Sequence, residues 1–242
     1  MRFSERDFHH LSHVMRIAVK EEIEVVVRDT WDAYHVRVIA LSDNVISAEI
    51  LGQLVVSSRY GKVGLVFGLS KGDKNDSIVR QAVEIGADFI YPTLFERSIV
   101  KLDEKKAVSR VQRLRTIAKA AAQQSHRKEI PHIADIQKLK APALAEEMST
   151  YDAVYVLWEE TQGNALSLKV DELLGNVGDT ASVLCVVGPE GGITNAEIEY
   201  LTEQGAQTAS LGPTILRVDT ANAVALAIVL SKLNSVYEET NE

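Results

Sequence analysis

The chain has 242 residues, of which 46% are hydrophobic and 25% are charged, and its formal net charge is −8. This composition is ordinary for a globular protein, and the acidic balance argues against a surface coated with basic residues for nucleic acid. A single cysteine, Cys185, excludes a disulfide framework and a multi-cysteine metal site within one chain. No apolar run approaches the ~18–20 residues of a membrane-spanning helix, and the first ten residues do not resemble a secretory signal. We therefore expect a cytoplasmic protein with no membrane partner.

Residues 1–60 are expected to form a small β domain after a helical start. Apolar residues recur at helical spacing from Phe8 to Ala18, which predicts a helix within residues 1–20. The pattern then changes to short, β-branched segments broken by Asp, Asn and Gly. The expected strands are 23–29, 33–41, 44–51 and 53–58. We expect them to form a barrel.

Residues 61–242 are expected to form a larger α/β domain. Apolar strands alternate with helical segments, which is typical of a mostly parallel sheet covered on both faces. The expected strands are 63–69, 88–94, 152–158, 181–187 and 208–212. The expected helices are 75–86, 104–125, 135–148, 195–204 and 220–233. Asp73 or Asn75 is expected to cap the first of these helices.

Three expected strands are followed by unusual sequence at their carboxyl ends, where open α/β sheets bind ligands. The three segments are Leu157 to Glu160, Gly188 to Gly192 and Leu211 to Arg217. Glycines in the second segment, GPEGG, allow backbone to approach a ligand closely. Its carboxylate, Glu190, suits a cationic ligand better than a phosphate. Each segment alone is also consistent with an ordinary turn or a capped loop.

Basic residues gather between residues 110 and 128 with no acidic residue among them. They are Arg110, Arg113, Arg115, Lys119, Arg127 and Lys128. This basic stripe suits a phosphate backbone, and a solvated helix face is the alternative. Arg97, which follows the strand 88–94, is either aimed at a phosphate or base or held in a surface ion pair with Glu96.

The histidines near the N-terminus invite a metal hypothesis, which we do not favour. His9 and His13 are four residues apart, but there is no HExxH motif and no nearby cysteine. Arg16 continues the same face, which favours contact with RNA. Cys185 lies within an apolar strand and is expected to be a buried small hydrophobe.

Taken in order, these segments resemble one family. VVGPEGGITNAEI (186–198) followed by LGPTILRVDTANAVALA (211–227) resembles the SPOUT-class ribosomal RNA small subunit methyltransferase E family. The resemblance extends to HHLSHVMR (9–16), KGDKNDSIVRQAVEIGADFIYP (71–92), ERS (96–98) and AAAQQSHRKEIPHI (120–133). It covers nearly the whole chain, and the ordered set is far more specific than any one piece.

The resemblance implies a PUA-like β-barrel over residues 1–60 and a SPOUT methyltransferase domain over residues 61–242. The second domain carries a deep C-terminal trefoil knot, a rare exception among protein chains. S-adenosylmethionine is the implied cofactor, with no metal, and N3 of a uridine in 16S ribosomal RNA is the implied target. The implied assembly is a homodimer packed through the knot region, which acts on the RNA in an assembled small subunit.

The resemblance also implies roles for individual residues. The implied cofactor-binding residues are Leu157, Trp158, Glu159, Gly188, Pro189, Glu190, Gly191, Gly192, Ile193, Leu211, Gly212, Ile215 and Leu216. Arg217 and Arg97 are expected near the target base or its phosphate, and Glu96 and Asp219 are candidate proton acceptors. The expected RNA-binding residues are His10, Arg16, Arg110, Arg113, Arg115, Lys119 and Arg127.

The chain also departs from the family pattern. Thr214 stands where the family favours an arginine, Gln81 where it favours a lysine, and Val218 with Asp219 where it favours Thr-Glu. Gln123 also departs, and the usual N-terminal strand with its arginine has no counterpart. These changes remove positive charges from the substrate side and leave the cofactor loops largely intact. A methyltransferase for tRNA or 23S ribosomal RNA, or a non-catalytic ribosome assembly factor, therefore stays open as an alternative.

Overall fold

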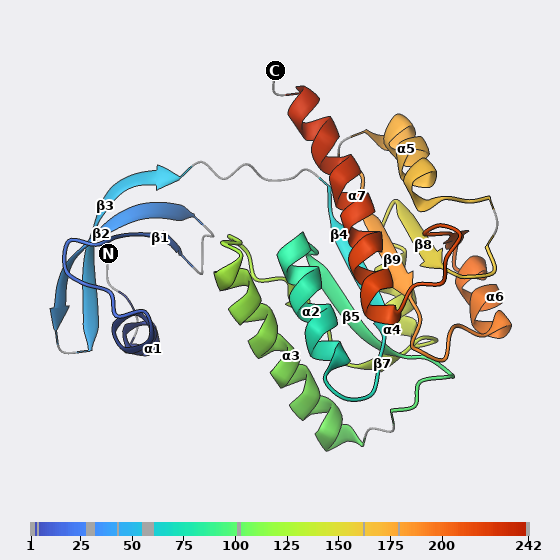
Figure 1. Ribbon diagram of the computed structural model, residues 1–242, viewed down its shortest axis with the longest axis horizontal. Coiled ribbons are helices and arrows are strands. Elements are labelled where there is room, and N and C mark those ends of the chain that lie inside the picture. The colour runs from blue at the N-terminus through green and yellow to red at the C-terminus, as the bar shows by residue number, and fades with distance from the viewer. Residues whose placement is uncertain are drawn as a thin grey trace. The chain divides into compact units, whose positions relative to one another are not determined.

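The computed structural model describes residues 3, 5–27, 32–42, 44–54, 61–100, 103–161, 163–178 and 180–240. The chain divides into two compact units, Met1–Ser58 and Arg59–Glu242. Figure 1 shows the smaller unit in blue and the larger one in cyan to red. Each unit has a hydrophobic core of its own.

The smaller unit is built on an antiparallel sheet of three described strands, in the order β1-β2-β3. The strands are β1 (Glu22–Val26), β2 (Ala33–Ser42) and β3 (Val45–Leu54). Ile17, Val38 and Ile46 form its buried centre. The expected strand over 53–58 begins within β3, and residues 55–58 lie outside the described residues.

The expected helix within residues 1–20 is shorter than its periodicity indicates. It consists of α1 (Glu5–His9) and the π-helical turn η1 (His10–Val14). Arg16 and Lys20 have positive φ angles of 55° and 77°, and such angles are incompatible with a continuing right-handed helix. The chain then turns so that Ile17 is buried in the core of the sheet.

The larger unit contains a parallel sheet in the order β10-β8-β9-β4-β5-β6, and β7 also pairs with β5. All of its described strand pairs are parallel. The strands are β4 (Val63–Gly68), β5 (Phe89–Leu94), β6 (His132–Ile133), β7 (Gln137–Lys138), β8 (Ala153–Leu157), β9 (Val183–Val187) and β10 (Gln207–Ala209). The prediction of a mostly parallel α/β sheet is confirmed.

Alternate residues of the central strands enter two separate cores, as expected for a sheet covered on both faces. In β9, Val183, Cys185 and Val187 face one core, whereas Leu184 and Val186 face the other. The first core is closed by α2 (Lys74–Ile85), α3 (Glu104–Gln124), α5 (Leu166–Val177) and α7 (Val218–Thr240). The second is closed by α4 (Pro142–Met148) and α6 (Asn195–Glu203). Three of the first group, α2, α3 and α7, lie together on the near side of the sheet in Figure 1.

The prediction of a helix over 135–148 is wrong in its first half. That stretch includes β7 and a turn, and α4 begins only at Pro142. Proline fits the first turn of a helix and disfavours helical geometry in the residue before it. Ala141 accordingly has an extended ψ of 135°. The sequence reading also missed α5, which lies between β8 and β9.

The expected cap of α2 is only half right. Asp73 occupies the N-cap position, but its side chain makes no capping hydrogen bond. Asn75 lies inside the helix, buried, where its side-chain amide accepts a hydrogen bond from the Ser70 amide and donates to the Ser70 carbonyl. This pair fixes the loop that follows β4.

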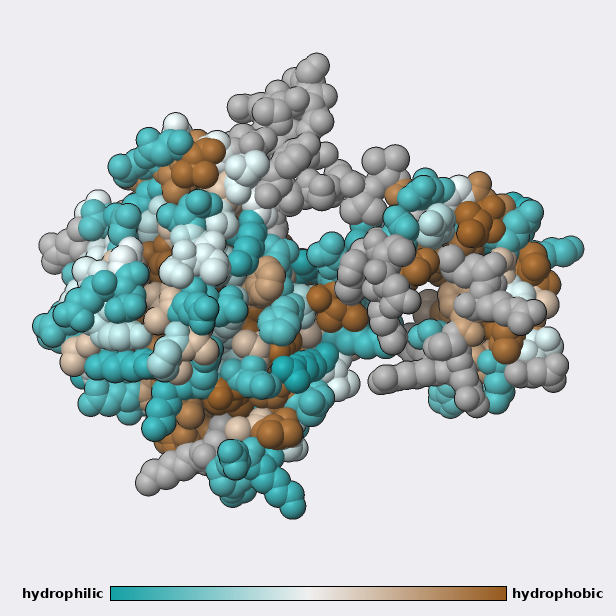
Figure 2. Space-filling view, turned by 180° about the vertical axis from the view of Figure 1, so that it is seen from behind, coloured by the Kyte–Doolittle hydropathy of each residue, from teal (hydrophilic) through white to brown (hydrophobic). Residues whose placement is uncertain are grey.

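Within the described residues, no helix is both long enough and apolar enough to cross a membrane. The face in Figure 2 agrees, since hydrophobic residues of the larger unit form separate patches among hydrophilic ones.

Candidate active site

Five strands of the larger unit, β4, β5, β8, β9 and β10, end at one edge of the sheet because they run parallel. The segments that follow them include all three loops selected from the sequence. Ligands of open α/β sheets bind at this edge. We therefore place the candidate site here.

The GPEGG loop after β9 packs tightly on its neighbours. A Cβ atom on Gly68, the last residue of β4, would lie 2.3 Å from the Pro189 nitrogen, so only glycine fits there. Gly188 and Pro189 are buried, and Gly192 has a φ of +75°, a conformation that favours glycine. Ile193 is buried behind the loop. The loop backbone is thus held in one shape while Glu190 and Gly191 stay exposed.

Glu190 already has a cationic partner in the chain itself. Lys74, at the start of α2, donates to its carboxylate over 3.0 Å. Partial burial raises the pKa of Glu190, but the hydrogen bond from Lys74 and neighbouring donors together lower that pKa below its ordinary value. Glu190 therefore stays ionised, and part of its charge is neutralised by Lys74.

The loop after β5 is bound directly to the GPEGG loop. The Arg97 guanidinium donates to the Gly191 carbonyl over 3.1 Å. The Glu96 amide donates to the Glu197 carboxylate over 2.6 Å, and the Glu96 carboxylate accepts from the Thr194 hydroxyl over 3.1 Å. Two of the three expected catalytic residues, Arg97 and Glu96, therefore adjoin the expected cofactor loop.

The loop after β8 reaches the same place from the other side. Leu157 is buried at the end of the strand, Trp158 is half-buried against the second core, and Glu159 is exposed. A Cβ atom on Gly192 would lie 3.3 Å from Glu159 Oε1, so the two loops are in contact.

The loop after β10 is held by hydrogen bonds at its first residues, and its later residues are exposed. The Ser210 amide donates to the Asn164 carbonyl over 2.8 Å, and the Ser210 hydroxyl accepts from the Gly212 amide. Leu211 and Leu216 are half-buried, whereas Ile215 is 84% exposed. Ile215 is one of several singly exposed apolar residues, and its exposure alone does not mark a binding surface.

Arg217, the third expected catalytic residue, is exposed at the end of that loop. No hydrogen bond or ion pair joins its guanidinium to the described residues around Arg97 or Gly191. Asp219, the other candidate proton acceptor, is half-buried in the first turn of α7. The structure thus binds Arg97 to the GPEGG loop and Glu96 to Thr194 and Glu197 just after it, whereas no side-chain hydrogen bond or ion pair joins Arg217 to these described residues.

Two polar atoms near these loops are buried without a hydrogen-bond partner among the described residues: the Thr161 hydroxyl and Asn222 Oδ1. Asn222 is 2% exposed, and its amide nitrogen donates to the Val218 carbonyl. A buried, unpaired acceptor costs about 1–3 kcal/mol, so a ligand that donated a hydrogen bond to Asn222 Oδ1 would recover part of that cost. Together with the close-packed glycines, these two polar atoms fit a cofactor with amino and hydroxyl groups.

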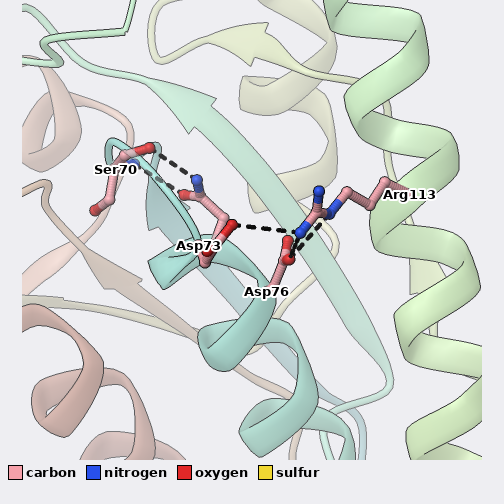
Figure 3. Close-up of polar contacts among 5 residues, drawn as sticks. Ser70, Asp73, Asp76 and Arg113 are labelled. Atoms are coloured by element: carbon pink, nitrogen blue, oxygen red, sulfur yellow. Dashed lines mark hydrogen bonds and ion pairs between the residues drawn. The ribbon is translucent and has the colours of Figure 1, made fainter.

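Three arginines of the basic stripe are engaged in contacts within the chain. Arg113 pairs with Asp76 and Asp73 at the start of α2 (Figure 3). Ser70, in the loop before α2, is labelled in the same view. Pairing with Asp76 raises the pKa of Arg113. The stripe is uninterrupted in sequence, but acidic residues from other elements lie against it.

The remaining residues of the stripe differ in their surroundings. Arg115 donates to the Ile133 carbonyl and pairs with Asp135. Arg127 is largely buried and donates to the Val83 and Ala87 carbonyls and to Asp88. Arg110 and Lys119 are half-buried on α3, and Arg110 lines a surface hollow of about 380 Å³. The same hollow is also lined by Asp73 and Asp76, so its charge is mixed.

The N-terminal histidines form no described metal site. The rings of His9 and His13 stack with centroids 4.8 Å apart. No group of three His, Cys, Asp or Glu residues that could hold a metal occurs in the part of the chain that the structure describes. Arg16 is exposed, and the side chain of His10 lies outside the described residues.

The sequence indicates Thr194 or Asn195 as the cap of α6 with Glu197 near its first turn, but it does not reveal the contact of Glu197 with Glu96 or that of Lys74 with Glu190. Lys74 could not be linked to Glu190 because the two residues are 116 positions apart. Glu197 carried a local signal, since Thr194 followed three residues later by Glu is the pattern of a capping box. The structure contains that box at the start of α6.

Comparisons with known proteins agree with this geometry. Residues 57–230 match the RNA methyltransferase domain family. The chain is 34% identical to the ribosomal RNA small subunit methyltransferase E of Bacillus subtilis over 92% of this chain and 86% of that protein. It is 35% identical to the protein of the same name from Mycobacterium bovis over 75% of this chain and 68% of that one. A crystal structure of that enzyme from Neisseria gonorrhoeae, bound to S-adenosyl methionine, superposes with a TM-score of 0.79 at 27% identity, covering 96% and 91% of the two chains.

Proposed function

The chain belongs to the ribosomal RNA small subunit methyltransferase E family, and on that premise we propose that it methylates N3 of a uridine in 16S ribosomal RNA, using S-adenosylmethionine. The observation that carries the proposal is the junction at Gly191. There, the expected substrate-side residue Arg97 is hydrogen-bonded to the expected cofactor loop. A ribosomal substrate would place the enzyme in the cytoplasm.

The cofactor would lie among the loops after β8, β9 and β10. Trp158 and Leu211 would supply apolar contacts, the GPEGG backbone would supply amide and carbonyl groups, and Asn222 Oδ1 would accept one hydrogen bond. When bound, the cofactor's sulfonium supplies an electrophilic methyl group. Glu190 would contribute only weak attraction to that positive charge, because Lys74 already pairs with it.

The chain's own residues would act by orientation and by charge. Holding acceptor and donor in line supplies up to ~7–11 kcal/mol of a reaction barrier. The uracil N3 has to lose its proton, and the resulting anion would be stabilised by the Arg97 and Arg217 guanidiniums. Glu96 is the proton acceptor that the geometry favours, because its carboxylate is fixed beside the cofactor loop by Thr194.

RNA would be held by a smaller basic surface than the sequence predicts. From the stripe, Arg110 and Lys119 would contact the RNA, and Arg16 would be a separate contact on the smaller unit. Arg113, Arg115 and Arg127 would contribute mainly to the fold, because each already pairs with a carboxylate.

The finer architecture is part of the same proposal. The antiparallel sheet of the smaller unit is consistent with part of a PUA-like barrel. A C-terminal knot is supported by the path of the chain, since β10 lies at the sheet edge beside β8 whereas α7 packs on β4 and β9. A homodimer packed through the C-terminal region is part of the same proposal and rests on the family membership.

The function is tested on 16S ribosomal RNA and small subunits from a strain that lacks the gene. Incubation with the purified protein and isotope-labelled S-adenosylmethionine, followed by mass mapping, should locate one N3-methyluridine in 16S RNA. If the label appears in tRNA or 23S RNA instead, the assignment of 16S RNA as the substrate is wrong. If calorimetry detects no binding of S-adenosylmethionine, the proposed methyltransferase activity is refuted and a role as a non-catalytic assembly factor is favoured.

The residue roles need a separate test. Arg217→Ala should lower the rate of methyl transfer by about 10²-fold while cofactor affinity changes little, since the guanidinium acts on the developing anion. An unchanged transfer rate would remove Arg217 from the reaction.

A further inference from the structure

Glu197 is a buried carboxylate beside the site for which the proposed reaction has no use. It lies in the first turn of α6 and is 3% exposed. Its two oxygens accept hydrogen bonds from different parts of the chain. Oε2 accepts from the Thr194 amide over 3.0 Å and from the Thr194 hydroxyl over 3.1 Å. Oε1 accepts from the Glu96 amide over 2.6 Å, across 101 positions of sequence.

A capping box alone does not require a carboxylate. Glutamine serves equally well at that position, because one side-chain oxygen is enough to reach back to the N-cap amide. The contact with Glu96 needs a second acceptor, and the amide nitrogen of glutamine only donates. The buried charge is compensated by the Thr194 and Glu96 amides and by the positive end of the helix, and the single Thr194 hydroxyl proton is shared between Glu197 and the Glu96 carboxylate. Glu197 is therefore matched to two simultaneous tasks, one local and one between loops.

The long-range task concerns residues at the site. The Glu96 amide is held by Glu197, the Glu96 carboxylate accepts from Thr194, and Arg97 donates to Gly191. We propose that Glu197 is a positioning residue that acts through the Glu96 amide and holds Glu96 and Arg97 against the cofactor loop. The importance given to Glu96 and Arg97 rests on the proposed function. The contact between Glu197 and the Glu96 amide does not depend on it.

The first test is Glu197→Gln, which keeps the shape and can satisfy only one of the two tasks. Asp103→Ala is the matched control, because Asp103 caps α3 by accepting from the Lys106 amide and takes no part in the site. Two measurements are made well below the unfolding temperature of each variant. They are amide hydrogen exchange of residues 95–98 and the steady-state constants for methyl transfer.

We expect Glu197→Gln to accelerate exchange of the 95–98 segment about tenfold and to lower kcat by about 10- to 100-fold, since a misplacement near 1 Å has such an effect. KM for the cofactor should stay within about threefold, whereas a general loss of fold would alter every constant. Asp103→Ala should leave exchange of this segment and kcat unchanged. Unchanged exchange or a kcat within twofold of wild type would overturn the inference, as would an equal effect of Asp103→Ala.

A second pair of variants removes the donor rather than the acceptor. Glu96 is the second residue of the turn Phe95–Ser98, closed by the Ser98 amide and the Phe95 carbonyl, and proline is favoured at that position. Glu96→Pro deletes both side chain and amide, whereas Glu96→Ala deletes the side chain alone. The proline variant should be about tenfold slower than the alanine variant, and equal rates would refute the role of the amide. If the wild-type chain transfers no methyl group, the proposed function fails, and the exchange measurement alone decides whether Glu197 fixes the loop.

Discussion

Replacing Gly191 with alanine tests whether the cofactor loop and the Arg97 loop must touch. A Cβ atom at this position would lie 2.8 Å from the Cβ of Arg97 and 2.9 Å from its carbonyl oxygen. Neither atom is the end of a flexible side chain, so rotation of a side chain cannot relieve the contact. One of the two loops has to move.

The required movement sets the expected magnitude. Ordinary contact between two carbons begins near ~3.5 Å, so the loops have to separate by roughly 0.7 Å. Forcing an extra methyl group into a packed site costs about 1–3 kcal/mol, and alanine returns about 0.4–1 kcal/mol by restricting the unfolded chain. We expect Gly191→Ala to lower the free energy of unfolding by about 0.5–2.5 kcal/mol. Because Arg97 moves with its loop, kcat for methyl transfer should fall about 10- to 100-fold.

Gly175→Ala is the matched control for this variant. Gly175 lies within α5, and a Cβ atom there would have no neighbour within 4 Å. Alanine should therefore raise the free energy of unfolding by about 0.5–1 kcal/mol through helix propensity, with no change in transfer. Both variants are compared by urea unfolding and by transfer of labelled methyl groups to 16S RNA. A Gly191→Ala protein that is as stable and as active as wild type would refute the packing argument.

Three further outcomes are expected. Hydrogen bonds from the Ser182 hydroxyl and amide lower the pKa of Asp152. The ionised carboxylate therefore stabilises the fold above its unfolded pKa, about 3.9, and this stabilisation is lost as the pH falls through the lowered value. The difference in the free energy of unfolding between wild type and Asp152→Asn, measured with urea, should be present at neutral pH and vanish in acid, and a difference that is constant with pH would contradict this. Complete burial raises the pKa of Cys185 to about 12, so a thiol reagent should modify it only after unfolding, and rapid labelling of the native protein would contradict its position. Arg127→Ala should cost about 2–4 kcal/mol in urea unfolding, because the Val83 and Ala87 carbonyls lose their guanidinium donor and Asp88, which still accepts from the Val63 amide, loses its ion pair. RNA affinity at a fixed salt concentration should not change. A large loss of affinity with normal stability would return Arg127 to the RNA surface.

The position of the site could be predicted from the sequence because it follows from local signals. Apolar strands of five or six residues, each followed by Gly, Pro and charged residues, define a parallel sheet whose carboxyl ends meet at one edge. Glu96 and Arg97 follow one of these strands. In the structure Arg97 donates to Gly191 of the GPEGG loop, and Glu96 contacts Thr194 and Glu197 just after that loop. The family resemblance assigned chemistry to these positions, which spacing alone could not do.

The rest depended on contacts that no local pattern encodes. Arg113 has the appearance of a free cation in its own helix, but it pairs with Asp76, 37 positions earlier. Helical periodicity over 135–148 is real only after Pro142, and the short strand before it is formed by pairing with β5. In both cases, tertiary partners decide what a charge or an apolar pattern does, and those partners are visible only in the folded chain.

The GPEGG loop illustrates why its motif is ambiguous when it stands alone. The charge of Glu190 is balanced by Lys74 at the start of α2, and Arg97 in the loop after β5 donates to the Gly191 carbonyl. The residues that follow the GPEGG loop are fixed by the capping box at the start of α6. The glutamate of this box, Glu197, also accepts a hydrogen bond from the Glu96 amide in the loop after β5. A site whose dipoles are fixed before the ligand arrives needs no reorganisation during the reaction. Here three separate segments fix the loop. Five residues of sequence therefore resemble an ordinary turn, whereas within the fold the same residues form one wall of the candidate site.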